Sequence, residues 1–213
     1  MKKIIFTVAA IFAFGFANAQ DKKESTGEGF SAGNVMLSGS AGFSSTTRGD
    51  VKNNTFNFSP RVGFFVTNNI AVGIALGVEG TKTEDFDGPT FVEQTRTDFS
   101  IGAFGRYYFT PASKFSVFAE LGFNVVSGKV DTDETLGGTT ISYESKVNGF
   151  NFGLAPGLSY FISDSWALEA KWGMLSYNTT EPDAPAGFTS ESTDTFNLGL
   201  DLDDLMLGLV YKF

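Results

Sequence analysis

The stretch FSVFAELGFNV at residues 115–125 decides the fold, because the character of its side chains changes at every position. One phase holds Phe115, Val117, Ala119, Leu121, Phe123 and Val125, and the other holds Ser116, Phe118, Glu120, Gly122 and Asn124. This period of two is typical of a β-strand with two unlike faces. Seven further runs alternate in the same way, at residues 35–44, 56–66, 70–79, 99–109, 150–162, 166–174 and 205–213. The sequence therefore predicts an all-β protein of eight strands.

The connections between the runs alternate in length. Those at residues 67–69, 110–114 and 163–165 are short and rich in Asn, Pro and Ser, as tight turns are. The others are long and polar, and cover roughly residues 47–54, 84–93, 128–142 and 178–193. Short turns at one end and long loops at the other indicate an antiparallel up-and-down barrel like those that cross bacterial outer membranes.

A soluble barrel with its apolar face inward also alternates, so the direction of the two faces has to be decided separately. The polar phase is mostly Gly, Ser, Ala and Asn, which suits a narrow interior better than a water-facing exterior. The apolar phase carries rings near both ends of the runs, as expected for girdles at two membrane interfaces. Near the short turns these rings are Phe64, Phe109, Phe115, Tyr160, Trp166, Tyr211 and Phe213, and toward the long loops they are Phe43, Phe56, Phe99, Phe123 and Phe150. Each run is about ten residues long, enough for a tilted strand to cross a bilayer. We therefore expect a transmembrane β-barrel, with a soluble ligand-binding barrel as the alternative.

The first nineteen residues have the features of an export signal. Lys2 and Lys3 precede an apolar run from Ile4 to Ala17, and Ala17-Asn18-Ala19 is a typical cleavage site. Residues 1–19 are thus a predicted signal peptide, and residues 20–32, which are polar and aperiodic, a flexible leader. The barrel domain is expected to occupy residues 33–213.

Composition excludes several kinds of chemistry. The 213 residues include no Cys and no His, so thiolate or histidine metal sites and histidine-based catalysis are excluded. The formal net charge of −9 argues against nucleic acid as a partner. We expect no cofactor, no bound metal and no enzymatic activity. The acidic motif Asp131-x-Asp133-Glu134 has oxygen ligands for a divalent cation but lacks the Gly and distal Glu of a calcium loop, so a solvated loop is the favoured interpretation.

The chain ends on a second recognisable pattern. Leu207, Leu209, Tyr211 and Phe213 alternate up to a terminal ring. With the alternation and the export signal, this end resembles the small eight-stranded outer-membrane barrels, a porin-like outer-membrane β-barrel family related in style to OmpX and the OmpA transmembrane domain. The resemblance implies outer-membrane location, contact with lipid and lipopolysaccharide, and a C-terminal signal read by the barrel assembly machinery. Members serve as adhesins, resistance factors, envelope anchors or narrow channels, so it implies no single function.

Six charged residues on the runs share the inward phase. They are Arg61, Arg106 and Lys171 against Glu79, Glu120 and Glu169. The turn at residues 110–114 sets Arg106 diagonally opposite Glu120, within side-chain reach, and Lys171 is expected opposite Gly157. We interpret the six as an ion-pair network that fills the lumen, with a gate whose pairs exchange as the alternative.

The apolar phase slips before the last run. Phe196, Leu198, Leu200 and Leu202 are in even phase, whereas Leu205 to Phe213 are in odd phase. This slip predicts a β-bulge at Asp203-Asp204, or a strand that begins afresh after it.

We expect a monomer with a plugged lumen and a structural or surface-interaction role, which acts through acidic surface loops on a ligand that the sequence does not name. The alternative function is a narrow channel for ions or small solutes.

Overall fold

The computed structural model describes residues 27–87, 89–183, 190–199 and 205–213. The strands in this part of the chain are β1 (Val35–Arg48), β2 (Val51–Phe65), β3 (Ile70–Asp87), β4 (Thr90–Tyr108), β5 (Phe115–Leu136), β6 (Thr139–Phe161), β7 (Trp166–Trp172), β8 (Leu175–Pro182), β9 (Thr193–Leu198) and β10 (Leu205–Lys212). Among these residues no helix has the length and apolar character that a membrane span requires.

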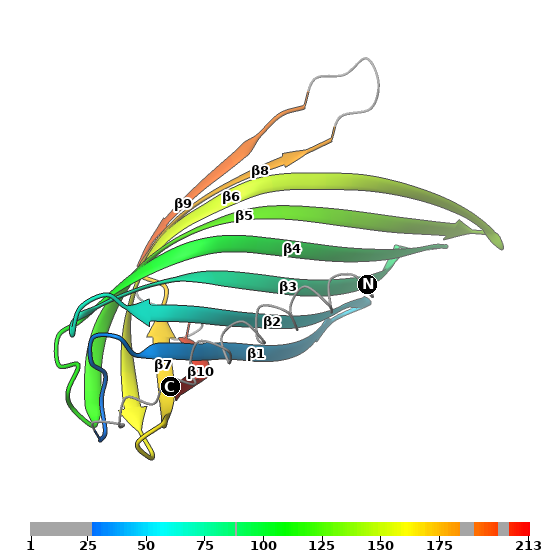
Figure 1. Ribbon diagram of the computed structural model, residues 1–213. Coiled ribbons are helices and arrows are strands. Elements are labelled where there is room, and N and C mark those ends of the chain that lie inside the picture. The colour runs from blue at the N-terminus through cyan, green and yellow to red at the C-terminus, as the bar shows by residue number, and fades with distance from the viewer. Residues whose placement is uncertain (1–26, 88, 184–189, 200–204) are drawn as a thin grey trace.

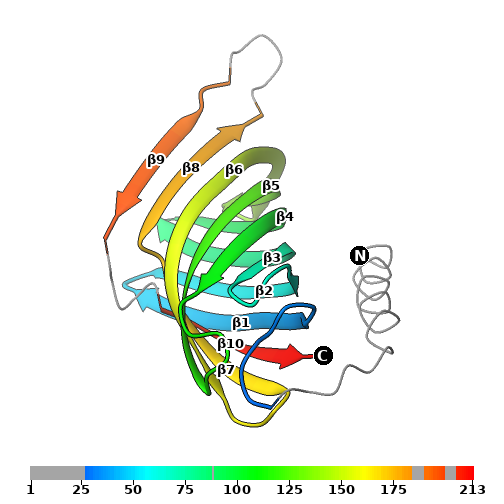
Figure 2. The same ribbon diagram turned by 60° about the vertical axis from the view of Figure 1, so that its left-hand side comes forward.

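The strands form one antiparallel up-and-down sheet that closes on itself. Consecutive strands from β1 to β7 are hydrogen-bonded neighbours, β10 pairs with β7, and β1 pairs with β10 (Figures 1 and 2). Closure therefore runs through eight strands, which confirms the predicted architecture. Both the start of β1 and the end of β10 lie at the end of the barrel that carries the short turns, which we call the short-turn end.

The last two barrel strands are each interrupted, which gives ten segments in place of eight. Along β6, Gly157 opposes Lys171 of β7 and Leu154 opposes Leu175 of β8, so the seventh strand holds one residue more than its partner over this stretch. One extra residue on one strand of a pair defines a β-bulge, and here the bulge lies at Gly173. The eighth strand is β9 followed by β10, which begins afresh at Leu205. The bulge predicted at Asp203-Asp204 lies outside the described residues.

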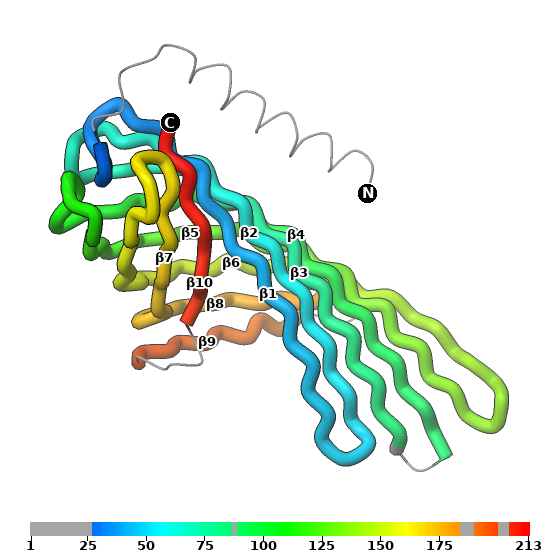
Figure 3. Tube along the Cα trace, turned by 90° about the horizontal axis from the view of Figure 1, so that it is seen from below, coloured from blue at the N-terminus to red at the C-terminus, as the bar shows by residue number. Residues whose placement is uncertain are grey.

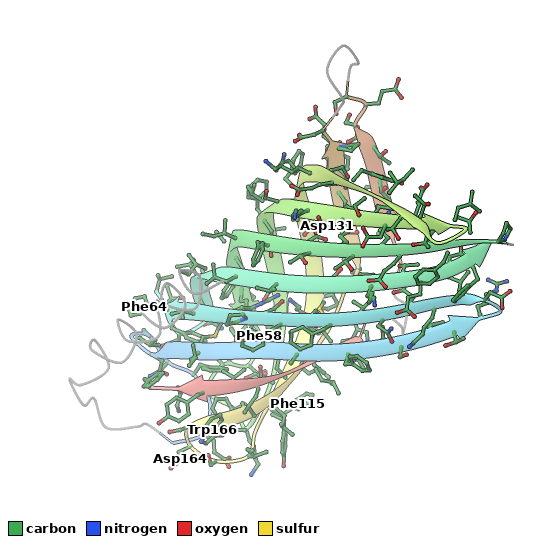
Figure 4. All side chains as sticks on the ribbon, turned by 90° about the vertical axis from the view of Figure 1, so that its right-hand side faces the viewer. Phe58, Phe64, Phe115, Asp131, Asp164 and Trp166 are labelled. Atoms are coloured by element: carbon green, nitrogen blue, oxygen red, sulfur yellow. The ribbon has the colours of Figure 1, made fainter. Side chains whose placement is uncertain are left out.

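The two faces of the sheet have the predicted directions. Apolar side chains such as Ile101, Leu121 and Leu168 point out of the barrel and are about half exposed. In Figure 4, Phe64, Phe115 and Trp166 lie toward the short-turn end. Asp131 lies away from them, on the β5–β6 hairpin. The buried residues line the lumen instead, and they are Phe30, Met36, Phe65, Ala71, Ala75, Phe104, Tyr108, Phe118, Phe161, Ala167 and Val210.

Three of the long connections are strands rather than the mobile loops expected from their polar sequences. β5 and β6 have 22 and 23 residues, about twice what a tilted strand needs to cross a bilayer. They meet at Gly137 and Gly138, whose positive φ angles of 57° and 83° allow a two-residue hairpin turn. Figure 3 shows hairpins β1–β2 and β5–β6 projecting from the same side of the barrel. The cross-strand ladder continues to the tips, because each polar residue still pairs its backbone with a neighbour.

The described part of the expected leader is packed rather than loose. Phe30 is 2% exposed, lies inside the short-turn end, and donates its backbone N–H to the Pro111 carbonyl at 2.6 Å. Lys212 Nζ donates to the carbonyls of Gly27 and Gly29 at 2.7 and 2.8 Å. Gly29 has a φ of 101° and lies so close to the Pro111–Ala112 backbone that a Cβ would clash. The buried ring and these hydrogen bonds hold the segment against the barrel. Residues 1–26, with the predicted cleavage site, lie outside the described residues.

Candidate functional site

The centre of the lumen holds a compact ion-pair network built on Arg106. Its side chain is fully buried, and its guanidinium donates from two nitrogens to both oxygens of Glu169, at 2.6 and 2.9 Å. Its Nε donates to Glu120 Oε2 at 2.5 Å. The turn predicts a diagonal position for Arg106 relative to Glu120. The β4–β5 ladder instead places the two residues directly opposite each other. The bidentate pair fixes the plane of the guanidinium across the barrel.

Glu120 is the hub of the network. Its Oε1 accepts from Arg61 and from Lys171, each at 2.7 Å, so this one carboxylate contacts three cations on three strands. Lys171 lies opposite Gly157, as predicted. The space over Gly157, however, is occupied by the ring of Phe118, and Lys171 reaches Glu120 alongside it.

Glu79, the sixth predicted member, does not join the network. It lies on β3 opposite Asp98 and lines a separate cavity of about 330 Å³ in the half of the barrel toward the hairpins. The residues brought together are therefore Arg61, Arg106, Glu120, Glu169 and Lys171. Three cations and two carboxylates leave this group with a formal charge of +1.

An aromatic layer, which the charge pattern does not predict, lies in the lumen at the short-turn end. Phe30 stacks on Phe65 at 4.6 Å between ring centroids and contacts Tyr108 and Phe161 at 4.9 and 4.8 Å. Tyr108 in turn contacts Phe118, whose ring lies 4.5 Å from the Arg106 guanidinium. The layer thus joins the network through a cation–π contact. The rings of this layer that lie on strands fall in the inward phase of their runs, so the phase could have predicted their place in the lumen. They are Phe65, Tyr108, Phe118 and Phe161.

The charged side chains of the network are paired with one another. Every charged group of the network is bound to a group of opposite charge, and no group of three or more acidic residues in the described part of the chain could hold a metal ion. The other half of the lumen is lined by amides and hydroxyls, where Asn151 donates to Asn178 and Asn197 to Ser176. The lumen is therefore charged and aromatic toward the short-turn end and polar toward the hairpins.

The C-terminal residues lie on the outer surface. Leu207 and Leu209 are 65% and 43% exposed. Tyr211 packs edge-on against Trp166 and Phe213 at 4.8 and 4.6 Å. The alternation predicted for the assembly signal is therefore present in the folded strand, with all four side chains in one phase.

The projecting hairpins are tied by ion pairs on their outer face. Lys129 lies 2.9 Å from both Asp131 and Glu144, and hydrogen bonds to these carboxylates raise the pKa of Lys129 to about 12. A raised pKa means that this contribution is complete below the usual value of 10.5 and is lost only as the pH rises through about 12. A hydrogen bond from Lys82 lowers the pKa of Glu84, whose contribution is lost only as the pH falls through that lowered value. Both pairs are intact at neutral pH.

Comparison with known proteins agrees with the fold. A model of the outer membrane protein β-barrel domain matches residues 6–213. Solved structures of similar fold include OprG from Pseudomonas aeruginosa, with 14% identity over 87% of this chain and 98% of that chain and a TM-score of 0.48. A major outer membrane protein from Thermus thermophilus has 15% identity over 85% and 100%, with a TM-score of 0.46. Ail of Yersinia pestis has 14% identity over 85% and 99%, with a TM-score of 0.39. No curated protein matches the sequence. The match over nearly the whole chain shows that it belongs to the outer membrane protein β-barrel domain family.

Proposed function

We propose that this outer-membrane barrel conducts no ions and acts at the cell surface through its projecting hairpins. The observation that supports the proposal is that the ion-pair network and the aromatic layer below it both lie across the lumen. A monomer, exported by a signal peptide cleaved after Ala19 and folded by the barrel assembly machinery, fits this role. Lipopolysaccharide and outer-membrane lipid would surround it. We expect no catalytic activity, since barrel enzymes characteristically use a histidine and this chain has none.

The hairpins offer a rigid surface for a partner. On the β5–β6 hairpin, Leu136, Ile141 and Tyr143 share the phase of the lumen-lining residues and are 56%, 65% and 53% exposed. The Tyr143 hydroxyl donates to Glu134 at 2.8 Å, which holds the ring in place. Clustered apolar side chains exposed to water mark interaction surfaces. We call Leu136, Ile141 and Tyr143 the hairpin patch.

Planar-bilayer recording tests the closure. We expect no reproducible conductance from the purified chain, because neither an ion nor its hydration water can pass the buried network without breaking its pairs. Openings that change in size when Arg106 or Glu120 is neutralised would contradict the proposal and favour the alternative, a narrow channel for ions or small solutes.

Substitution of the hairpin patch tests the surface role. Ile141→Ser with Tyr143→Ser is expected to reduce attachment of cells that display the chain by roughly tenfold, because the apolar area available to a partner is lost. Attachment is counted on protein-coated, polysaccharide-coated and bare apolar surfaces. Thr140→Ala with Ser142→Ala, on the opposite face of the same hairpin, is the matched control. Equal attachment of both variants and the parent would exclude the patch as the binding surface.

A further inference from the structure

The sheet separates on one side of the barrel. β1 is paired with β10 only from Met36 to Gly39, although β1 continues to Arg48 and β10 begins at Leu205. Beyond this point no ladder joins β1 to β9 or β10 in the described residues. Figures 1 and 2 show β9 and the corresponding part of β1 on opposite edges of the curved sheet. We call the region above the Gly39–Leu209 pair, between β1 and β10, the slot.

The slot lies at hydrocarbon depth. Phe43, an outward ring expected at the upper interface, comes after Ser40, Ala41 and Gly42 on β1, so these three residues lie within the apolar band. Backbone groups left unpaired in hydrocarbon are strongly unfavourable, because no water is there to hydrogen-bond them. An exposed strand edge at this depth therefore favours a bound group that carries polar atoms.

A small cavity of about 20 Å³ lies at the base of the slot, where the two strands separate. Its wall includes Ser38, Ser40, Arg61, Lys171 and Met206. Glu169 also lines it, but both oxygens of that carboxylate already accept from Arg106. The cavity thus joins the positive side of the ion-pair network to the slot.

The groups around this cavity have unused donors. Ser38 is 7% exposed, and its Oγ has no hydrogen-bond partner among the described residues. Among the described residues Arg61 donates from one nitrogen only, to Glu120, and it is the most exposed member of the network, at 19%. These donors and the formal charge of +1 on the network favour the binding of an anionic group. A volume of about 20 Å³ takes a water-sized atom, such as one carboxylate oxygen, and is too small for a phosphate or sulfate.

Above the small cavity a larger one of about 380 Å³ continues along the interruption of the last two strands. The two share Met206, and the larger adds Met174, Leu175 and Leu205 to its wall, with Asn57 and Ser176 on the polar side. Flexible Met side chains adapt to apolar chains of varied shape. An anion site at the base and an apolar wall above it together fit an amphipathic molecule.

We propose that the slot binds the carboxylate of a single-chain amphipath, such as a fatty acid from the outer leaflet. One carboxylate oxygen accepts from Arg61 and Ser38 at the base, and Lys171 adds its charge. The acyl chain lies against Met206, Leu205 and Met174. This site is independent of the hairpin patch and of whether the lumen conducts.

The test uses the full chain folded in nonionic detergent and dodecanoate labelled with ¹³C at its carboxyl carbon. We expect a carboxyl resonance distinct from that of micellar dodecanoate, and the bound acid stays ionised at a pH where the micellar acid is protonated. Arg61→Met is expected to weaken binding at least roughly tenfold, and Ser38→Ala a few-fold, since each removes one donor to a charged acceptor. Arg48→Met, on the exposed β1–β2 tip, is the matched control and is expected to bind as the parent does.

Three outcomes overturn the proposal. One is the absence of a distinct resonance in a protein that still migrates differently on gels with and without boiling. Another is displacement of dodecanoate by acetate or chloride at equal concentration, which would identify a site for free small anions. The third is unchanged binding in both Ser38→Ala and Arg61→Met. Because Glu120 keeps Arg106 and Lys171 as partners in the Arg61 variant, that variant is expected to fold.

Discussion

Replacing Glu120 with alanine is expected to lower the free energy of unfolding by about 3–5 kcal/mol, the range for breaking a buried ion pair by removal of one partner. Glu120 is the one carboxylate among the described residues that contacts Arg61, Arg106 and Lys171 together. Without it, Arg106 keeps Glu169, but Arg61 and Lys171 lose the carboxylate to which both donate. The Lys171 side chain is only 8% exposed, so its charge would face a medium that solvates it poorly.

The measurement is denaturant unfolding of the barrel in lipid vesicles, followed by the fluorescence of its two Trp residues. Asp131→Ala is the control, because it breaks an ion pair on the projecting hairpin whose two side chains are about half exposed. Exposed pairs contribute about 0.2–1 kcal/mol. If Glu120→Ala unfolds within about 1 kcal/mol of Asp131→Ala, the network does not stabilise the barrel as described.

Two further variants separate charge from packing. Glu120→Gln keeps the shape and one acceptor oxygen, so it is expected to fall between the parent and Glu120→Ala. Glu120→Ala with Lys171→Met removes a stranded cation together with its partner, and it should recover part of the loss. An additive double variant would show that Lys171 and Glu120 are not coupled through their 2.7 Å contact.

The alternation of the sequence predicts most of the fold and part of the site. A one-residue error in phase would turn every side chain of a strand to the other face, so each run fixes its own orientation. That is why the sequence alone places Arg106 near Glu120 in the lumen, and Lys171 in the lumen opposite Gly157. Glu79 shares their phase, but phase says nothing of height along the barrel, and Glu79 lies in the half toward the hairpins.

Other features have only a weak signal of period two, or lie outside the alternating runs. The rings of Phe65, Phe104 and Phe118 fall in the inward phase, but they are few among many Gly and Ser residues, so the average character of that phase conceals them. Phe30 lies outside any run. The slot depends on where the β1–β10 ladder stops, which is a contact between the two ends of the chain. The polar connections become strands because their backbones pair with neighbouring hairpins, a tertiary effect that overrides local composition.

Phe30→Ala is the second substitution with a large expected effect, about 3 kcal/mol, at the lower end of the range for a buried Phe. The ring packs against Phe65, Tyr108 and Phe161, and its removal leaves a cavity that no neighbouring side chain in the described residues can fill from the end of the barrel. Without the ring, residues 27–34 lose their buried contact with the barrel, so this segment is expected to detach more readily than the strands. Proteolysis between residues 27 and 34 should therefore rise while the strands stay protected.

Phe86→Ala is the matched control for this experiment. Phe86 lies on the outer face of the β3–β4 hairpin, is 57% exposed and contacts the ring of Phe91 at 4.7 Å. An exposed pair of rings contributes about 0.5–1.5 kcal/mol. Equal losses in the two variants, with no new cleavage near Phe30, would contradict the role of Phe30 as the anchor of the segment.

The same variant separates the two proposed closures of the lumen. Loss of Phe30 opens the aromatic layer but leaves the pairs among Arg106, Glu120 and Glu169 in place. We therefore expect Phe30→Ala to remain closed to ions in planar bilayers, because the network alone blocks the path. Conductance in Phe30→Ala but not in the parent would show that the ring layer is the seal, and that water passes between the charged side chains once the ring is gone.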